Sequence, residues 1–340
     1  MDYFRPIAMT DAARPAGALP LAGGWCWFDR AEHLTRAGSR GLVAAADLPA
    51  EACARLTAPR APLAGLTLKT PRLMGILNVT PDSFSDGGRF FAAEVARVHA
   101  AEMAADGADI LDIGGESTRP GAADVVEADE IARTAPVIAA LVAGGIAAPV
   151  SIDTRKAAVA RAALDAGAAM VNDVAALTYD RALGALVAER DVPVCLMHAR
   201  GTPATMQEDP RYDDVLLDVY DWLDERIAAA EALGIARGRI VVDPGIGFGK
   251  TAAHNLALLR GLSLFHSLGV PVLLGASRKR FIGTYGGGTA VARADLRGPG
   301  TVAVTLAGVA QGVQIHRVHD IVETRQALRL WQAVTFGAEP

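Results

Sequence analysis

Short apolar runs and longer amphipathic stretches alternate along the chain from about residue 70. The apolar runs are bounded by polar or glycine-containing segments, which is typical of buried strands. Eight such runs can be counted, at residues 73–77, 110–113, 149–152, 170–172, 192–197, 240–242, 271–274 and 313–318. The pattern therefore predicts eight strands.

The stretches between these runs are rich in Ala and Leu, which favour helix. Glycines follow several of them at positions where a helix would stop. The predicted helices span residues 92–105, 127–143, 156–166, 213–233, 253–268, 301–311 and 320–333. Strands that alternate with helices pair in parallel through right-handed crossovers, and eight such units predict an α/β fold of the (β/α)8 TIM barrel type.

A doubly wound open sheet is the alternative architecture for such an alternation. It is disfavoured because six strands are typical of that fold, and because no Gly-x-Gly-x-x-Gly turn follows the first predicted strand. The barrel therefore remains the predicted fold, over residues 71–340.

The first 70 residues differ from the rest of the chain. They are rich in Ala, Pro and Arg, show little periodicity, and contain the cluster Gly-Gly-Trp-Cys-Trp-Phe at residues 23–28. We interpret residues 1–70 as an N-terminal extension, partly ordered against the barrel, whose Trp pair could cover the barrel bottom, mediate assembly or do neither. A second unusual segment, Tyr285 to Pro299, is predicted to be a loop that either is solvated or borders the active site.

Polar side chains follow every predicted strand. In a (β/α)8 barrel these strand ends converge on one mouth, where active sites lie. Single Asn, Asp and Ser residues at such positions are often only helix caps or turn residues, but eight polar ends together favour a functional site. The polar ends begin at Asn78, Gly114, Asp153, Asn172, His198, Asp243, Ser277 and Arg317.

Two groups within this ring predict two kinds of ligand chemistry. Asp153, Asn172 and Asp243 offer hydrogen-bond acceptors and an amide, which suit a flat heterocycle with several N–H donors, and Lys279 adds a cation. A second group suits phosphate oxygens and consists of Asn78, Thr118, Arg317 and His319. One ligand with a polar heterocycle and a phosphate group would satisfy both groups.

A tightly bound transition metal is not indicated, because the seven histidines are dispersed and the three cysteines lie far apart. A Mg2+ ion held mainly by substrate phosphates remains compatible, with Asn78 as its protein ligand. The sequence lacks a complete phosphate-binding Gly-x-x-x-x-Gly-Lys-Ser/Thr loop, which excludes a nucleoside triphosphatase of that class. Cys195 lies within an apolar run, which favours an inert core residue over a nucleophile.

Composition adds limits on partners and location. The 340 residues carry 33 basic and 38 acidic side chains, a formal net charge of −5 without a basic cluster, so nucleic acid is not an expected partner. No apolar stretch is long enough to span a membrane, no secretion signal is recognisable, and the few cysteines fit a reducing cytoplasm. Of the 33 basic residues 29 are Arg, and three of the four lysines fall in polar clusters.

Several long motifs in order make the chain resemble the dihydropteroate synthase family, the folate-pathway target of sulfonamides, over about residues 72–335. The matching segments are GILNVTPDSFSDGG at 75–88, DIGGESTRPG at 112–121, SIDT at 151–154, VND at 171–173, LMH at 196–198, GTPATMQ at 201–207, DPGIGFGK at 243–250, SRK at 277–279 and RVHD at 317–320. The resemblance implies a TIM barrel that joins p-aminobenzoate to 6-hydroxymethyl-7,8-dihydropterin diphosphate and releases pyrophosphate. It also implies a homodimer.

The same resemblance assigns roles to individual residues. It places the pterin on Asp153, Asn172, Asp243 and Lys279, and the diphosphate with Mg2+ on Asn78, Thr118, Arg317 and His319. The implied p-aminobenzoate pocket consists of Thr118, Pro120, Phe248, Ser277 and Lys279. The expected catalytic residues are Asp153, Lys279, Arg317 and His319.

The expected chemistry is a dissociative substitution at the pterin methylene. Arg317, His319 and Mg2+ would stabilise the departing pyrophosphate, and Asp153 would offset the positive charge left on the pterin. Two alternatives keep the fold: a corrinoid-linked methyltetrahydrofolate methyltransferase, and a non-catalytic pterin-binding relative. Both fit less well, because residues suited to a diphosphate and an arylamine acid are present at 117–121 and 317–320.

Overall fold

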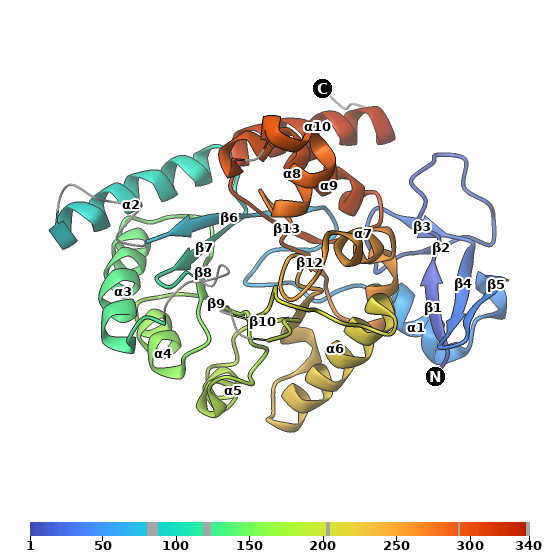
Figure 1. Ribbon diagram of the computed structural model, residues 1–340, viewed down its shortest axis with the longest axis horizontal. Helices are drawn as coiled ribbons and strands as arrows, with labels where there is room; N and C mark the ends of the chain where they lie inside the picture. Colours follow the sequence, from blue (N-terminus) through green and yellow to red (C-terminus); the bar gives the residue numbers. More distant parts are fainter. Residues whose placement is uncertain (80–87, 118–123, 202–204, 292, 338–340) are drawn as a thin grey trace.

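The computed structural model describes residues 1–79, 88–117, 124–201, 205–291 and 293–337, and its largest element is a closed barrel of parallel strands (Figure 1). Each strand pairs in parallel with its neighbour, and a parallel bridge between Val242 and Val272 closes the ring. The barrel strands are β6 (Arg72–Asn78), β7 (Ile110–Gly114), β8 (Val150–Asp153), β9 (Met170–Asp173), β10 (Val194–Met197), β11 (Ile240–Asp243), β12 (Leu273–Leu274) and β13 (Ile315–Val318). The predicted eight strands and the (β/α)8 architecture are confirmed.

Helices follow the strands and surround the barrel (Figure 1). Asp180, Asp214 and Thr251 each accept backbone N–H hydrogen bonds at a helix start, which satisfies donors that the helix itself leaves unpaired. The helices of the barrel are α2 (Gly88–Ala105), α3 (Glu127–Ala143), α4 (Ala157–Asp165), α5 (Arg181–Arg190), α6 (Val215–Ala232), α7 (Ala252–Arg260), α8 (Arg280–Gly286), α9 (Gly298–Val309) and α10 (Ile321–Phe336).

Three helical features differ from the sequence-based expectation. Helix α5 was not predicted, because its charged residues and Gly184 weaken the Ala and Leu pattern. The single helix predicted over 253–268 is wrong: α7 ends at Arg260 with Gly261 as its C-cap, and the chain continues as a 3-10 helix. Gly261 packs closely on Leu216, where a Cβ would lie only 2.6 Å away. The predicted loop at Tyr285–Pro299 is wrong as well, since it contains the end of α8, two short 3-10 helices and the start of α9.

The lower part of the barrel interior is filled by one apolar side chain from each of several strands. Met74, Met170 and Cys195 belong to this layer, and all three are buried. Leu63 and Leu68, which precede β6, pack against the same layer and cover the barrel bottom. Burial raises the pKa of the Cys195 thiol well above its ordinary value, which supports the interpretation of an inert core residue.

The N-terminal segment forms a small sheet beside the barrel, near α6 and α7 in the view of Figure 1. Its strands β1 (Tyr3–Pro6), β4 (Arg30–Thr35) and β5 (Gly38–Ala44) are antiparallel, and this sheet is accompanied by the pair β2 (Leu19–Pro20) and β3 (Trp27–Phe28) and by α1 (Ala50–Thr57).

Long-range hydrogen bonds fasten this segment to the barrel's helical layer. Trp25 Nε1 donates to Val309 O at 2.8 Å, and Tyr3 Oη donates to Asp221 Oδ2 at 2.9 Å. Trp27, by contrast, donates to Asp11 O within the segment itself. The Trp pair therefore does not cover the barrel bottom. Within the described part of the chain, no helix combines the length and apolar character needed to cross a membrane.

Candidate active site

A guanidinium from β13 joins carboxylates from two other strands at the mouth of the barrel. Arg317 Nε donates to Asp112 Oδ2 at 2.6 Å, and Arg317 Nη2 donates to Asp153 Oδ2 at 2.7 Å. Asn172 Nδ2 donates to the same Asp112 oxygen at 2.9 Å. The ends of β7, β8, β9 and β13 are thus connected by one polar network.

The network is shielded from water, which perturbs its protonation. Burial raises the pKa of Asp153 to about 7, against the opposing effect of the Arg317 charge. For Arg317, burial acts to lower the pKa, but Asp112 and Asp153 outweigh it and raise the pKa above its ordinary value. A perturbed carboxyl beside a fixed cation at a barrel mouth is characteristic of a functional site.

Asp112 is a central member of this network that the sequence analysis did not select. Its side chain is fully buried, and its Oδ1 has no hydrogen-bond partner among the described residues. The sequence pattern singled out residues that follow each strand, whereas Asp112 lies inside β7, between Leu111 and Ile113. A carboxylate within an otherwise apolar strand was the signal, because burial of an ionised group is costly without partners.

Asp243 ends β11, and Lys279 caps the start of α8, after the end of β12. Asp243 Oδ1 accepts a hydrogen bond from Gly245 N at 2.7 Å, and burial raises the pKa of this carboxyl to about 6. The charges of Lys279 and Arg317 both act on it. A Cβ at Gly275 would lie 3.2 Å from Asp243 Oδ2, so the glycine leaves space on that side of the carboxylate.

Lys279 also contacts an aromatic ring. Its Nζ lies 3.9 Å from the centroid of Phe248, a favourable cation–π distance. Ser277, two residues before Lys279, pairs with His319: the Ser277 Oγ and His319 Nδ1 are 2.9 Å apart, and His319 N donates to the same Oγ at 3.2 Å. The predicted residues Phe248, Ser277, Lys279 and His319 are therefore brought together in these two pairs.

Asn78 ends β6 next to the central carboxylate. A Cβ placed on Gly114 would lie 3.6 Å from both Asn78 Oδ1 and Asp153 Oδ2, so the backbone of Gly114 lies close to both of these side-chain oxygens. Among the described residues, no three His, Cys, Asp or Glu side chains are grouped as a metal site. The predicted site residues Thr118 and Pro120 lie outside the described residues.

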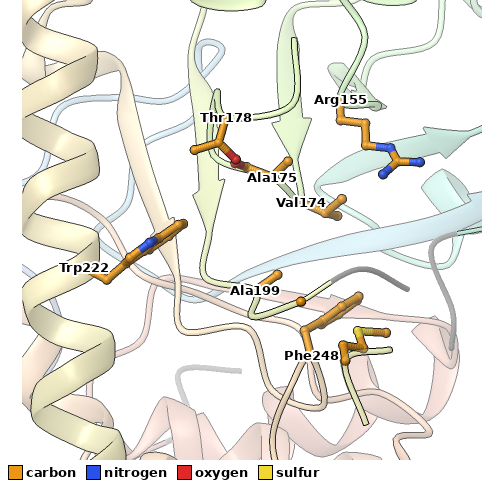
Figure 2. A pocket seen from close by; sticks show the side chains of 9 residues that line it. Arg155, Val174, Ala175, Thr178, Ala199, Trp222 and Phe248 are labelled. Carbon is orange, nitrogen blue, oxygen red and sulfur yellow. The ribbon is translucent and has the colours of Figure 1, made fainter. Parts of the chain in front are cut away.

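A small cavity of about 110 Å³ opens beside Phe248. Figure 2 shows Trp222 approaching it from α6, opposite Arg155, which comes from the loop after β8. Val174 and Met206 add apolar surface. The cavity is therefore an apolar compartment at the rim of the mouth, with one guanidinium on its wall.

Lys156, in the polar segment after β8, is held in a buried network of ion pairs. Lys156 Nζ is 2.7 Å from Glu130 Oε2 and 3.1 Å from Glu116 Oε1, and it donates to Val125 O at 2.6 Å. Burial opposes the charge of Lys156, but its bonds to Glu130 and Glu116 raise its pKa. This buried ion network joins the two ends of the connection between β7 and α3.

Comparison with known proteins gives a consistent result. The model of the pterin binding enzyme family matches residues 74–319. A dihydropteroate synthase from Neisseria meningitidis serogroup C is 47% identical over 270 residues, covering 78% of this chain and 94% of the relative. The dihydropteroate synthase of Escherichia coli K12 is 45% identical over 274 residues, covering 81% of this chain and 95% of the relative. The chain belongs to the dihydropteroate synthase family.

Solved structures of dihydropteroate synthases agree with this assignment. The Xanthomonas albilineans enzyme with 4-aminobenzoic acid is 49% identical, has a TM-score of 0.75, and covers 82% of this chain and 98% of its own. The same enzyme in complex with 7,8-dihydropteroate has a TM-score of 0.73 at 47% identity, covering 82% of this chain and 99% of its own. The segment matched by the family model includes every predicted site residue from Asn78 to His319.

Proposed function

We propose that this chain is a dihydropteroate synthase that condenses 6-hydroxymethyl-7,8-dihydropterin diphosphate with p-aminobenzoate, giving 7,8-dihydropteroate and pyrophosphate. The observation that carries the proposal is the polar network of Arg317, Asp112, Asp153 and Asn172 at the mouth of a barrel of this family. The similar Xanthomonas albilineans enzyme has been solved with 4-aminobenzoic acid and, in another structure, in complex with 7,8-dihydropteroate.

The pterin is proposed to bind to Asp153, Asn172, Asp243 and Lys279. Carboxylates accept hydrogen bonds from ring N–H and amino groups, while the Asn172 amide and the Lys279 ammonium donate to ring acceptors. The network places Asn172 and Asp153 within one set of hydrogen bonds through Asp112 and Arg317. Asp112, with one unpartnered oxygen among the described residues, is an additional acceptor for this ring.

The diphosphate is proposed to bind to Asn78, Thr118, Arg317 and His319. Arg317 belongs to both halves of the site, because its guanidinium already bonds Asp153. Asn78 would hold Mg2+ through its amide oxygen, a hard oxygen donor of the kind this ion prefers, with the substrate phosphates and water as the other ligands. When bound, Mg2+ would neutralise charge on the phosphate oxygens.

p-Aminobenzoate is proposed to occupy a pocket formed by Thr118, Pro120, Phe248, Ser277 and Lys279. The Phe248 ring supplies an apolar face for the benzene ring, and Lys279 above it supplies a positive charge. When His319 Nδ1 carries a proton and donates it to Ser277 Oγ, the Ser277 hydroxyl is able to donate to the carboxylate. Together these groups orient the arylamine nitrogen toward the pterin methylene.

The substitution is proposed to be dissociative. The C–O bond breaks first, and its electron pair leaves with pyrophosphate, whose charge Arg317 and His319 stabilise. The positive charge on the methylene spreads into the pterin, and the buried Asp153 carboxylate offsets it. The arylamine nitrogen then forms the C–N bond and loses a proton to solvent or pyrophosphate. A bridging-oxygen isotope effect on kcat/KM is expected, and its absence would contradict rate-limiting C–O cleavage.

The decisive assay follows pyrophosphate release by the purified protein with pterin diphosphate and Mg2+, with and without p-aminobenzoate. Release that requires p-aminobenzoate is expected. Pterin binding without release would instead indicate a methyltransferase or a non-catalytic pterin-binding protein, and the proposed reaction would be wrong.

Assembly, location and domain division complete the proposal. We infer a homodimer formed through barrel helices, since Leu330 and Val334 on α10 are 64% and 78% exposed and α9 carries no charged residue. Sedimentation of a monomer alone would contradict it. We infer a cytoplasmic location, which the free cysteine thiols Cys26, Cys53 and Cys195 fit. Residues 71–340 are proposed to form the catalytic domain, with residues 1–70 as an extension.

A further inference from the structure

The loop after β11 contains a buried lysine that has no place in the proposed reaction. Lys250 is 2% exposed, and its Nζ lies 2.8 Å from His198 Nδ1. It also donates to Phe248 O at 3.0 Å and to His198 O at 3.3 Å. When Lys250 is protonated and His198 Nδ1 carries no proton, these three acceptors match the three N–H donors of the ammonium.

This arrangement does not resemble an ordinary stabilising ion pair. In the described part of the chain, no carboxylate oxygen lies within ion-pair distance of Lys250 Nζ, whereas Lys156 has two such partners. Burial lowers the pKa of Lys250 to about 7, although the more distant Asp243 raises it. A cation buried without a carboxylate opposes folding, so its presence calls for a role other than stability.

The lysine holds two loops against each other, and the fit between them is tight. A Cβ on Gly245 would lie 1.8 Å from His198 O, and one on Gly249 would lie 2.4 Å from Arg200 O. Both glycines have a positive φ, 67° and 63°. The loop after β11 therefore lies directly on the backbone after β10, and Lys250 connects the two at their centre.

Phe248 is the residue that this connection fixes most directly. Lys250 binds the Phe248 carbonyl, and the neighbouring Gly247 is held on both sides, by Gln207 Nε2 at its carbonyl and by Asn255 Oδ1 at its N–H. The Phe248 ring in turn lies against Lys279. A shift of the loop would displace the ring that forms one face of the arylamine pocket.

We propose that Lys250 is a positioning residue for the arylamine: with His198 as its partner, it holds the backbone of Phe248 so that the ring packs against p-aminobenzoate beside Lys279. This inference rests on the proposed synthase function. It concerns mainly the second substrate, because Lys250 has no hydrogen bond to a described residue of the Arg317 network and acts on the pterin residue Asp243 only through its charge.

The first test is steady-state kinetics of Lys250→Met, which keeps an unbranched chain but removes all three donors. The KM for p-aminobenzoate is expected to rise about tenfold or more, since misplacing a binding group is costly, while the KM for pterin diphosphate changes by less than about twofold. Lys69→Met, at an exposed lysine before the barrel, is the matched control and is expected to match the wild type.

A second pair of variants tests the partner and covers the case in which Lys250→Met fails to fold. His198→Asn keeps an acceptor at the δ position, and His198→Leu removes it. Both lose the edge contact with Trp222. The KM for p-aminobenzoate is expected to rise in His198→Leu and to stay closer to the wild-type value in His198→Asn.

A double variant shows whether the effect acts through the ring. In a Phe248→Leu background, Lys250→Met is expected to add less than about twofold to the KM for p-aminobenzoate, because coupled residues are not additive. If the wild-type protein does not release pyrophosphate in a p-aminobenzoate-dependent way, both the proposed reaction and this inference are wrong. An active wild type whose two KM values respond equally to Lys250→Met, or do not respond, would overturn the inference alone.

Discussion

Arg317 Nη2 donates to Asp153 Oδ2 at 2.7 Å, so the residue proposed to bind the leaving group is bonded to the residue proposed to stabilise the pterin cation. If both roles hold, the groups that act on the two ends of the reacting bond belong to one ion pair. Pterin binding and pyrophosphate departure would then be connected through the side chains of β8 and β13.

Asp153→Asn tests the electrostatic role of this pair. The variant keeps the size of the side chain and removes its charge, so turnover is expected to fall about 100-fold or more, as for the loss of one preorganised charge-stabilising group. Circular dichroism and thermal melting are expected to show an intact fold. Asp129→Asn, at an exposed aspartate in α3, serves as the control. Near-native turnover of Asp153→Asn would disprove the role.

Asp112→Asn tests the residue that only the structure revealed. Arg317 and Asn172 both donate to its Oδ2, and an amide oxygen at that place would still accept these bonds but without the negative charge that strengthens them. We expect kcat/KM for pterin diphosphate to fall by about 10- to 100-fold, the value of a charge-assisted hydrogen bond. The KM for p-aminobenzoate is expected to change little. Unchanged pterin kinetics would show that Asp112 is only structural.

Pterin binding is expected to weaken on acidification. Burial raises the pKa of Asp243 to about 6, so the folded protein takes up a proton there as the pH falls from about 7 to 5, and an acceptor for the ring is lost. The raised pKa also affects folding, because the folded protein binds this proton more tightly than the unfolded chain. The contribution of Asp243 to stability is therefore largest below pH 3.8 and is lost as the pH rises through about 6. Calorimetry with a pterin that lacks phosphate measures the effect. Because Asp153 also titrates near pH 7, the comparison is made in an Asp153→Asn background. There, Asp243→Asn should bind weakly without this pH dependence, and a parallel pH dependence with and without Asp243→Asn would contradict the assignment.

Arg278 stands between Ser277 and Lys279 with a φ of 56°, which is strained for a residue with a side chain. Its guanidinium is bonded to Asp320, and its N–H donates to Thr301 Oγ1 at 2.9 Å. Arg278→Ala is expected to lower the free energy of unfolding by about 1–3 kcal/mol, through the lost ion pair. Arg278→Gly should lose about 1 kcal/mol less, because glycine adopts positive φ freely. Equal losses in urea denaturation would contradict the strain argument.

The barrel bottom offers a test that leaves the mouth untouched. Leu63 is 1% exposed and packs on the lower layer of the barrel. Leu63→Ala is expected to reduce the free energy of unfolding by about 2–5 kcal/mol, with normal activity per folded molecule. Leu42→Ala, at a side chain 60% exposed on β5, should change it by less than about 0.5 kcal/mol. A small loss at Leu63 would show that residues before β6 do not complete the core.

Local patterns of apolar and polar residues were sufficient to predict the barrel and most of the polar residues at its mouth. Each strand is a short apolar run followed by polar residues, so the position of Asp153 or Asp243 at a strand end is encoded within a few neighbouring residues. The parallel fold then brings those ends together without further information. The extension was harder to interpret, because β1 pairs with β4 and β4 with β5 through long-range contacts, without a local period that identifies them.

The sequence by itself determined the order of the strands, the chemistry at their ends and, through its motifs, the family. Only the tertiary structure decided which of those groups share a proton or a partner. Asp112 is buried inside a strand, and its partner Arg317 lies 205 positions away in the sequence. Lys250 is buried in a glycine-rich loop, and its partner His198 lies 52 positions away. Burial and hydrogen bonding between distant segments set these interactions, and no local pattern of hydrophobic and polar positions contains them.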